Sequence, residues 1–381
     1  GGKLWHFDTG LVSTDGIKPL DGAVATLRPE GKFGGAVAVE EGTTNQIFVA
    51  GYVSWFANLN VGDSTDRSVG GGTIRVTRLG EHRYRAEVIA DCTYPILSLT
   101  NGFTWPANQP HTMSAYILDY YEAPGTTGRF GLGRSTSGAA SLHGANGLGR
   151  KTYTHQDTTD INAGFAVRAF NHLIKAGTYI EWEFAQVELN KPFATSFVDG
   201  TRAKGALHYD GSQLSVGANE GTFSMWMYVD VSIPRGGEYP SYPQPCRLEF
   251  ESGALWCRSY YPNQFNLLAS TDDGRWTSVG GNITNTGWHL WTATWSGGVA
   301  SIYIDGSKAG SRVLGDYAPS GRLSKLYVGC GHTNPAVPGS LFDEVLVLPY
   351  AASEEEIVSW YEAQGPLPPH PQALLQWDWQ A

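Results

Sequence analysis

The sequence is poor in charged residues and has no surplus of basic ones. Only 16% of its 381 residues are charged, and 26 basic residues stand against 36 acidic ones, giving a formal net charge of −10. Nucleic-acid-binding proteins usually present a basic patch, and no cluster of Lys or Arg occurs here. No apolar run approaches the roughly 20 residues that a membrane-spanning helix needs. The sequence therefore predicts neither a nucleic-acid partner nor membrane insertion.

Cysteine is also scarce. The four cysteines are Cys92, Cys246, Cys257 and Cys330, too few and too scattered for a disulfide scaffold. Cys246 and Cys257 flank a turn-like segment, so a simple hairpin would bring them together, either as a disulfide or as two free thiols. Burial as free thiols is the usual state of unpaired cysteine and is the favoured alternative.

Glycine and aromatic residues are abundant instead, with 48 Gly, 13 Trp and 19 Tyr. This composition is typical of short strands joined by tight turns. Residues 287–306 are the clearest example, because alternating large residues lead into Ser296-Gly297-Gly298 and a β-branched segment follows. Both faces of this predicted hairpin are apolar, which favours a position inside a two-sheet structure. The sequence predicts an all-β protein.

The chain divides into four parts on strand and turn signals. We expect two tandem antiparallel β-sandwich domains of the jelly-roll type, with an N-terminal arm and a C-terminal tail. The predicted parts are residues 1–45 (arm), 46–200 (first domain), 201–364 (second domain) and 365–381 (Pro-rich spacer and apolar tail). The arm is too short to fold alone, and exposed apolar residues at a terminus seldom stay exposed. We expect both ends to dock on this chain or on a partner subunit.

The first domain carries short strands separated by turns such as Gly70-Gly71-Gly72. Its segments 111–117 and 177–189 resemble the carbohydrate-binding jelly rolls attached to glycan-degrading enzymes and phage tail proteins. Two flanking segments, VEEGTTN at 39–45 and KPFATSFVDGTR at 191–202, are similar to a recurring pattern of bacteriophage structural proteins. That resemblance implies a location on the surface of a virion, in the tail or on the capsid.

The second domain shows an ordered series of segments that resembles the concanavalin A-like, laminin G-like jelly roll. The series contains residues 207–211, 223–229, the hairpin at 288–306, 326–329 and 339–347, and it ends with a short helix after Ser353. Ser353 and Glu356 have the spacing of a capping box. The resemblance implies that Trp226, Trp288 and Trp295 are structural.

Glycoside hydrolysis is the enzymatic alternative, because some concanavalin-like folds cleave sugars. The pairs Glu181/Glu183 and Glu249/Glu251 each lie two residues apart on one predicted strand face, which is compatible with that chemistry. Neither pair matches the E-x-D-x-E strand motif of the hydrolytic branch. No G-x-S-x-G elbow, phosphate-binding loop or His/Cys pair with zinc spacing occurs. The sequence predicts no enzyme and no catalytic residue.

Calcium is the one cofactor that the sequence suggests. Many laminin G-like and sugar-binding jelly rolls hold a calcium ion, which prefers about 6–8 oxygen ligands. The candidate ligands are Asp272, Asp273 and Asp343. The alternative for Asp272-Asp273-Gly274 is an ordinary turn.

Aromatic residues are the candidate glycan contacts, since flat rings stack on sugar faces. Those of the first domain could line a groove, and those of the second cluster in loop-rich sequence, and loops on rigid sandwiches carry function. Each of them alone is more often a core residue. The candidates are Trp105, Tyr120 and Tyr121 in the first domain and Tyr239, Tyr242, Trp256, Tyr260, Tyr261 and Trp276 in the second.

Together these patterns predict a non-catalytic structural and adhesive protein of a phage virion. Its expected partners are host-surface polysaccharide, other virion proteins and further copies of itself, with a trimer as one form. Two alternatives stay open. The first is a glycoside hydrolase or an accessory module of one, and the second is a capsid decoration protein with no ligand.

Overall fold

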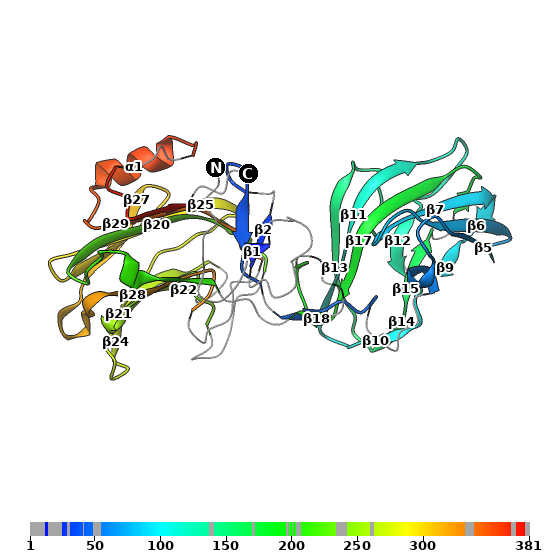
Figure 1. Cartoon of the computed structure of the whole chain (residues 1–381). Coiled ribbons are helices and arrows are strands. Elements are labelled where there is room, and N and C mark those ends of the chain that lie inside the picture. Colours follow the sequence, from blue (N-terminus) through cyan, green and yellow to red (C-terminus); the bar gives the residue numbers. More distant parts are fainter. Residues whose placement is uncertain are drawn as a thin grey trace. The chain divides into compact units, whose positions relative to one another are not determined.

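The computed structural model describes residues 12–13, 25–28, 31–40, 42–48, 55–136, 141–169, 172–195, 197, 199, 201–202, 207–233, 242–259, 263–331, 339–366 and 371–377. The chain forms two compact units (Figure 1). We call Gly1–Gly42 with Ala203–Ala381 the composite unit and Thr43–Arg202 the inserted unit. Regular structure in the described residues is almost all β-strand, which confirms the predicted all-β class.

The composite unit contains a nine-stranded sheet and a six-stranded sheet. The first has the order β1 (Val12–Ser13), β2 (Ala25–Arg28), β3 (Ala36–Ala38), β29 (Phe342–Leu348), β20 (Glu220–Val229), β25 (Gly287–Ser296), β26 (Val299–Ile304) and β27 (Ser307–Val313), with β30 (Leu375–Trp377) also on β29. The second has the order β19 (Leu207–Asp210), β28 (Ser320–Val328), β21 (Cys246–Ser252), β22 (Ala254–Ser259), β23 (Phe265–Ser270) and β24 (Trp276–Val279). Short 3₁₀ helices lie at Gly211–Gln213 and Gly315–Tyr317.

Both chain ends add strands to this unit, so the N-terminal segment is not a separate arm. Val37 of β3 pairs with Phe342 of β29, and Val345 of the same strand pairs with Trp377 of β30. Asp343 of β29 accepts a hydrogen bond from the backbone N–H of Phe33 at 3.2 Å. The expected order of an arm and two consecutive domains is thus corrected: the first unit interrupts the second in the sequence, because the edge of β29 is completed by residues from both termini.

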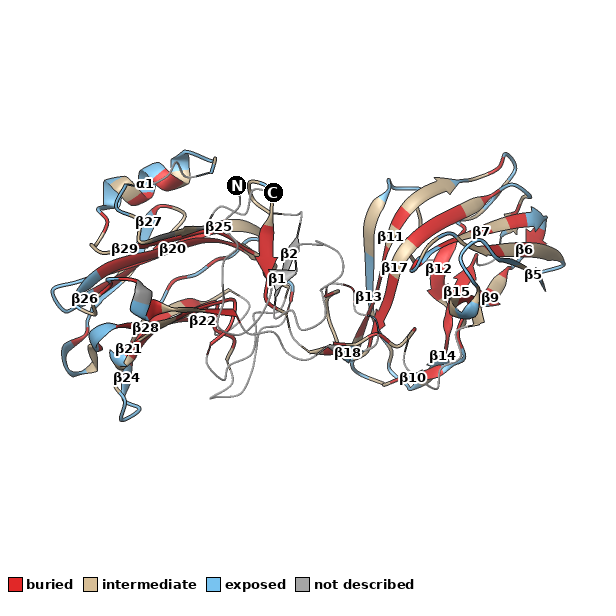
Figure 2. Ribbon diagram, viewed as in Figure 1, coloured by how far each residue is buried: buried red, intermediate tan, exposed pale blue. Residues whose placement is uncertain are grey.

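The predicted hairpin is confirmed as β25 and β26, joined by Gly297 and Gly298 at positive φ. Its residues contribute to two apolar cores, one on each side of the sheet, which explains why both faces of the hairpin are apolar. Trp291 and Trp295 pack between the two sheets, whereas Leu290 and Tyr303 face the helix α1 (Glu354–Glu362). Figure 2 shows buried residues along the length of these central strands.

The helix covers the outer face of the nine-stranded sheet (Figure 1). Its predicted capping box is confirmed: Ser353 accepts from the N–H of Glu356, and the Glu356 side chain accepts from the N–H of Ser353. Ile357 and Trp360 are buried against the sheet, where Trp226 is 0% exposed. Among the described residues no helix is both long and apolar enough to cross a bilayer.

The inserted unit packs a six-stranded sheet against smaller ones around its own apolar core. The large sheet has the order β13 (Gly149–Gln156), β11 (Pro110–Tyr121), β17 (Tyr179–Glu188), β7 (Arg83–Ala90), β6 (Gly72–Arg78) and β5 (Ser64–Val69). A three-stranded sheet has the order β12 (Gly131–Arg134), β15 (Phe165–Arg168) and β9 (Ile96–Ser98). Paired strands are β10 (Phe103–Trp105) with β14 (Ile161–Ala163), β16 (Leu173–Ile174) with β8 (Cys92–Thr93), and β18 (Thr201–Arg202) with β4 (Thr43–Thr44), and a 3₁₀ helix spans Trp55–Asn58.

All four cysteines are buried, and none of them forms a disulfide. Cys246 and Cys257 are direct cross-strand partners on β21 and β22, as the hairpin predicted, and they face the core as thiols. Burial raises the pKa of the Cys246 thiol to about 12, so it stays protonated at neutral pH.

Candidate ligand-binding faces

The outer face of the six-stranded sheet in the composite unit carries a group of aromatic and arginine side chains. Strand β22 alternates, so that Leu255 and Cys257 enter the core while Trp256 and Arg258 point to the other side. Arg247 of β21 lies directly opposite Trp256, and its guanidinium carbon is 5.0 Å from the ring centroid. Its Nε also donates to Glu249 Oε1 at 2.8 Å.

Arg258 brings two of the predicted aromatic residues together. Its guanidinium carbon lies 5.1 Å from the ring centroid of Tyr242 and 5.3 Å from that of Trp276. Trp276 is 43% exposed, so a broad ring surface meets solvent beside a fixed positive charge. We call Tyr242, Arg247, Trp256, Arg258 and Trp276 the arginine–aromatic face.

The chemistry of this face suits a sugar. An indole or phenol ring offers a flat apolar surface with a polar edge, and a guanidinium supplies several donors in a rigid plane that match hydroxyl and carboxylate oxygens. Stacking against the rings restrains both arginines before any ligand arrives, which lowers the entropy lost on binding. The other predicted aromatics of this region, Tyr239, Tyr260 and Tyr261, lie outside the described residues.

In the inserted unit, the structure separates the three predicted aromatics. Trp105 is 1% exposed, stacks on Phe103 and donates from Nε1 to the carbonyl of Ala163 at 2.9 Å. It is a core residue with no face toward solvent, because β10 places it on the apolar side of its sheet. Tyr120 also points inward, and its hydroxyl donates to Glu122 at 2.5 Å.

Tyr121 alone of the three is exposed, at 47%. It points away from the core of the inserted unit, where its ring lies 6.0 Å from that of Tyr179 on β17. The guanidinium carbon of Arg85 lies 3.9 Å from the Tyr179 centroid, and Asp119 accepts from the Tyr179 hydroxyl at 2.9 Å. Neither Tyr179 nor Arg85 was among the predicted residues, although the alternation along β7 and along residues 179–183 of β17 places them beside Tyr121.

Two of the carboxylates considered for hydrolysis, Glu181 and Glu249, are engaged in ion pairs. Glu181 accepts from Arg83 Nε at 2.7 Å, and its second oxygen lies 3.7 Å from Arg85 Nε. Glu249 is held by Arg247, as described above. A glycosidase requires one carboxyl that gives up a proton and another that attacks or activates water, whereas these two carboxylates are held by arginine side chains.

The candidate calcium ligands also have protein partners. Asp272 accepts from the Ser252 hydroxyl and the Gly253 N–H, and Asp273 accepts from Thr271 and Arg275. The bond from the Thr271 hydroxyl, followed by those from Arg275, lowers the pKa of Asp273 to about 2. Asp343 is 1% exposed and joins Phe33 to β29. These contacts fit the turn alternative for Asp272 and Asp273, and bound calcium stays a prediction that titration with Ca²⁺ tests.

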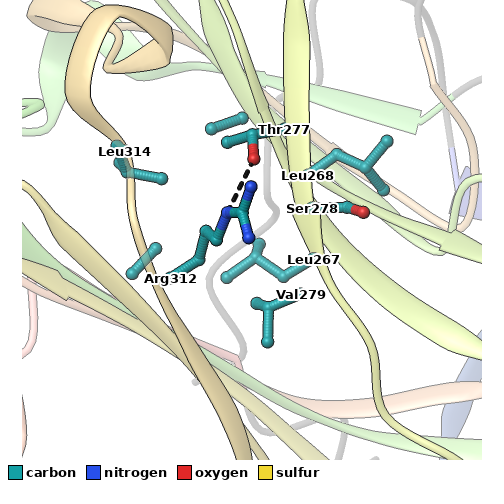
Figure 3. A pocket seen from close by; sticks show the side chains of 9 residues that line it. Leu267, Leu268, Thr277, Ser278, Val279, Arg312 and Leu314 are labelled. Atoms are coloured by element: carbon teal, nitrogen blue, oxygen red, sulfur yellow. Dashed lines mark hydrogen bonds between the residues drawn. The ribbon is translucent and has the colours of Figure 1, made fainter.

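A hollow lies between β23, β24 and β27 of the composite unit (Figure 3). Arg312 reaches across it and donates from Nε to the Thr277 hydroxyl at 2.9 Å. Its walls are Leu267, Leu268, Val279 and Leu314, and it has no space for a water molecule. Because these side chains fill the hollow, it offers no room for a ligand.

Comparison with known proteins gives one family match. A model of the concanavalin A-like lectin/glucanases superfamily matches residues 195–358. No curated protein matches the chain.

Solved structures with some similarity include the receptor binding domain of botulinum neurotoxin C/D mosaic serotype (13% identity, 39% of this chain and 37% of that chain, TM-score 0.32). The binding domain of botulinum neurotoxin serotype D gives 12% identity over 42% and 40%, with a TM-score of 0.34. A native heptameric SAP-like pentraxin from Limulus polyphemus gives 13% identity over 46% and 83%, also with a TM-score of 0.34. The chain spans about two fifths of the length of the neurotoxin structures. Residues 195–358 are thus similar to the concanavalin A-like lectins and glucanases, and all of this match except residues 195–202 lies in the composite unit.

Proposed function

We propose that this protein is a non-catalytic structural and adhesive protein on the surface of a bacteriophage virion, and that it binds host-surface glycan through the arginine–aromatic face. The observation that carries the binding role is the position of Arg258 between the rings of Tyr242 and Trp276. The match of residues 195–358 to a superfamily that includes lectins supports a binding domain in this unit.

The absence of turnover is part of this proposal. The matched superfamily also contains glucanases, so the fold alone does not decide between binding and hydrolysis. The pairing of Glu181 with Arg83 and Arg85, and of Glu249 with Arg247, supports a binding role. If incubation with bacterial polysaccharides released new reducing ends, and Glu181→Gln abolished them, the glycosidase alternative would hold.

The phage setting rests on the sequence patterns at 39–45 and 191–202. Within the inserted unit these patterns meet: Thr44 and Thr201 share a hydrogen bond of 3.1 Å, and Glu188 accepts from the hydroxyls of both Thr43 and Thr195 at 2.7 Å. Residues of the two patterns therefore join the incoming and outgoing segments of the inserted unit. Several copies in one particle, as in a trimer, would raise the avidity of a weak glycan site.

A glycan array followed by calorimetry with the strongest oligosaccharide tests the binding face. We expect Trp276→Ala and Arg258→Ala each to weaken binding about tenfold, which is about 1.4 kcal/mol. Tyr153→Ala is the matched control, since Tyr153 is 38% exposed on the inserted unit and belongs to no proposed face. Unchanged affinity in both test variants would exclude this face as the glycan site.

The decoration alternative has its own readout. If the array gives no signal at millimolar sugar, while the protein binds tightly to virions that lack it, the protein is a structural component without a glycan ligand. Electron microscopy of particles labelled with an antibody to this chain locates it in the tail or on the capsid.

A further inference from the structure

Three donor side chains converge at one end of the inserted unit. Glu81 and His82 lie in the turn between β6 and β7, and Asp199 lies in the segment that leads out of the unit. His82 Nε2 is 3.6 Å from Glu81 Oε1 and 3.4 Å from Asp199 Oδ2. One ligand atom from each of the three residues lies within 4.8 Å of the others, and this is the one such group among the residues that the structure describes.

The imidazole is held from behind by phenylalanine rings. Phe197, Phe48 and Phe184 lie 4.9, 5.3 and 5.9 Å from it between ring centroids, and His82 is 7% exposed. Phe184 adopts a positive φ of 51° at a bulge of β17, a conformation that is costly for a bulky residue. The backbone N–H of Phe184 donates to the carbonyl of His82 at 3.2 Å. The aromatic walls therefore fix the imidazole and aim Nε2 at the two carboxylates.

We propose that Glu81, His82 and Asp199 form a binding site for a divalent transition-metal ion of the zinc class. A tetrahedral ion with ligands at about 2.0–2.2 Å has its ligand atoms roughly 3.3–3.6 Å apart. The two measured distances from His82 Nε2, 3.4 and 3.6 Å, have that length. An imidazole nitrogen favours zinc, copper or nickel over calcium and magnesium, which prefer oxygen alone.

One coordination position remains for water or a ligand oxygen. The Glu81 and Asp199 side chains are 72% and 46% exposed, so the site opens to solvent on the side opposite the phenylalanines. Zinc sites with three protein ligands hold water or a ligand in the fourth position. A bound ion would join the β6–β7 turn to the outgoing segment, close to the pairing of β18 with β4.

Calorimetric titration of the full chain with Zn²⁺ tests the proposal, using protein without a histidine tag and stripped of metal beforehand. We expect one saturable site, and we expect Asp199→Asn and His82→Gln each to weaken it about tenfold or more, since even residues behind the ligands contribute 10–100-fold. Asp199→Asn keeps the core intact, because its side chain is half exposed. Co²⁺ bound in place of Zn²⁺ should give the visible absorption of a four-coordinate site, and this signal should disappear in both variants.

His155→Gln is the matched control. His155 also lies beside a carboxylate, Asp157, at 2.9 Å, but Arg134 pairs with the same carboxylate. We expect this variant to bind Zn²⁺ like the unaltered protein. The proposal is overturned if Zn²⁺ gives no saturable binding, or if Asp199→Asn and His82→Gln bind it as tightly as His155→Gln does. Either result would mean that the group is an ion pair of protonated His82 with the two carboxylates.

Discussion

The two units cover the outer faces of their large sheets in different ways. In the composite unit the nine-stranded sheet is covered by α1, and Trp226 is buried between them with Phe33 and Tyr361 at 5.7 and 5.9 Å. In the inserted unit the outer face of the six-stranded sheet carries ion pairs, such as Arg83 with Glu181 and Arg75 with Asp66. The first sheet has two apolar cores and the second has one.

This difference appears in the strand patterns. Strand β25 is buried at nearly every position, whereas β7 alternates between buried and accessible residues. A strand with apolar residues on both faces needs a second covering layer, and a strand that alternates needs only one. The outer face of the inserted unit is consequently available for binding, whereas that of the nine-stranded sheet is used for stability.

The largest expected difference between the two units is the loss of stability when one outward side chain is removed from each. We expect Trp226→Ala to lower the free energy of unfolding of the composite unit by about 3–5 kcal/mol, because it leaves a large cavity beneath the helix. Arg85→Ala removes an outward residue of the inserted unit that is paired with Asp119 and Glu181 near the surface. It should cost about 1 kcal/mol or less.

Hydrogen exchange in increasing urea, read by mass spectrometry, measures both changes unit by unit. Exchange in β20, β25 and α1 reports the composite unit, and exchange in β7 and β17 reports the inserted unit. Equal losses of unfolding free energy in the two variants would show that both outer faces contribute equally to stability, which would contradict the comparison.

The buried carboxylate of Glu188 in the inserted unit should give the next largest effect. Glu188 is 0% exposed and accepts from Thr43 Oγ1, Thr195 Oγ1 and the Thr195 N–H at 2.7, 2.7 and 2.9 Å. We expect Glu188→Ala to destabilise the inserted unit by about 2–3 kcal/mol, because charged hydrogen bonds are lost and buried donors are left without an acceptor.

Glu188→Gln is the control, since it keeps one acceptor oxygen and should lose less. Thermal unfolding followed by circular dichroism, together with the exchange measurement, separates the two. If the Ala and Gln variants unfold at the same temperature as the unaltered protein, the segments 43–45 and 195–202 are held by other contacts.

Local signals in the sequence predicted the elements that depend on a few neighbouring residues. The hairpin of β25 and β26 followed from alternation around two glycines, and the helix start followed from the spacing of Ser353 and Glu356. Both structures are closed by short-range hydrogen bonds, so their residues alone specify them.

Features that depend on tertiary pairing were not predicted. The three residues of β3 contain no information on their partner β29, which lies in the other half of the chain. Trp105 was predicted to line a groove, since β10 has only three residues, too few to define an inward face. His82 and Asp199 show no metal-ligand spacing, since only the fold brings a turn and the outgoing segment together.

The two aromatic faces should differ in how much they contribute to glycan binding. On the arginine–aromatic face, Arg258 stacks on two rings and Arg247 pairs with Glu249. On the inserted unit, Arg85 lies beside two carboxylates, Asp119 and Glu181. A carboxylate near the guanidinium reduces the net positive potential that meets an acidic sugar. We expect Tyr121→Ala to weaken binding of an anionic oligosaccharide by about twofold to threefold, against about tenfold for Trp276→Ala.

Calorimetry with matched neutral and anionic oligosaccharides measures the loss of affinity in each variant. The difference between the two variants should grow with the charge of the sugar and shrink at high salt. If Tyr121→Ala had the larger effect, the principal glycan site would lie on the inserted unit.

The smallest expected effect is an opposite response of the two units to pH. In the composite unit, burial disfavours charged His289, but the bond from Nδ1 to Asp305 at 2.7 Å and the charge of Asp305 outweigh it, so the pKa is raised above 6.5. In the inserted unit, burial lowers the pKa of His111 below 6.5. His111 Nδ1 accepts from the Asn190 N–H, which requires the unprotonated nitrogen.

The signs follow from proton linkage. A raised histidine pKa stabilises the fold below the ordinary value of 6.5, and this contribution is lost as pH rises through the folded-state pKa. A lowered pKa stabilises the fold above 6.5, and this contribution is lost as pH falls. Between pH 7.5 and 5.5 the composite unit should therefore gain stability through His289 while the inserted unit loses it through His111. Asp305→Asn, which keeps a residue suited to the positive φ of 54° at this turn, should remove the gain and leave the loss unchanged. Because hydrogen exchange assigns each change to its own unit, a common direction in both would contradict the opposite placement of these two imidazoles.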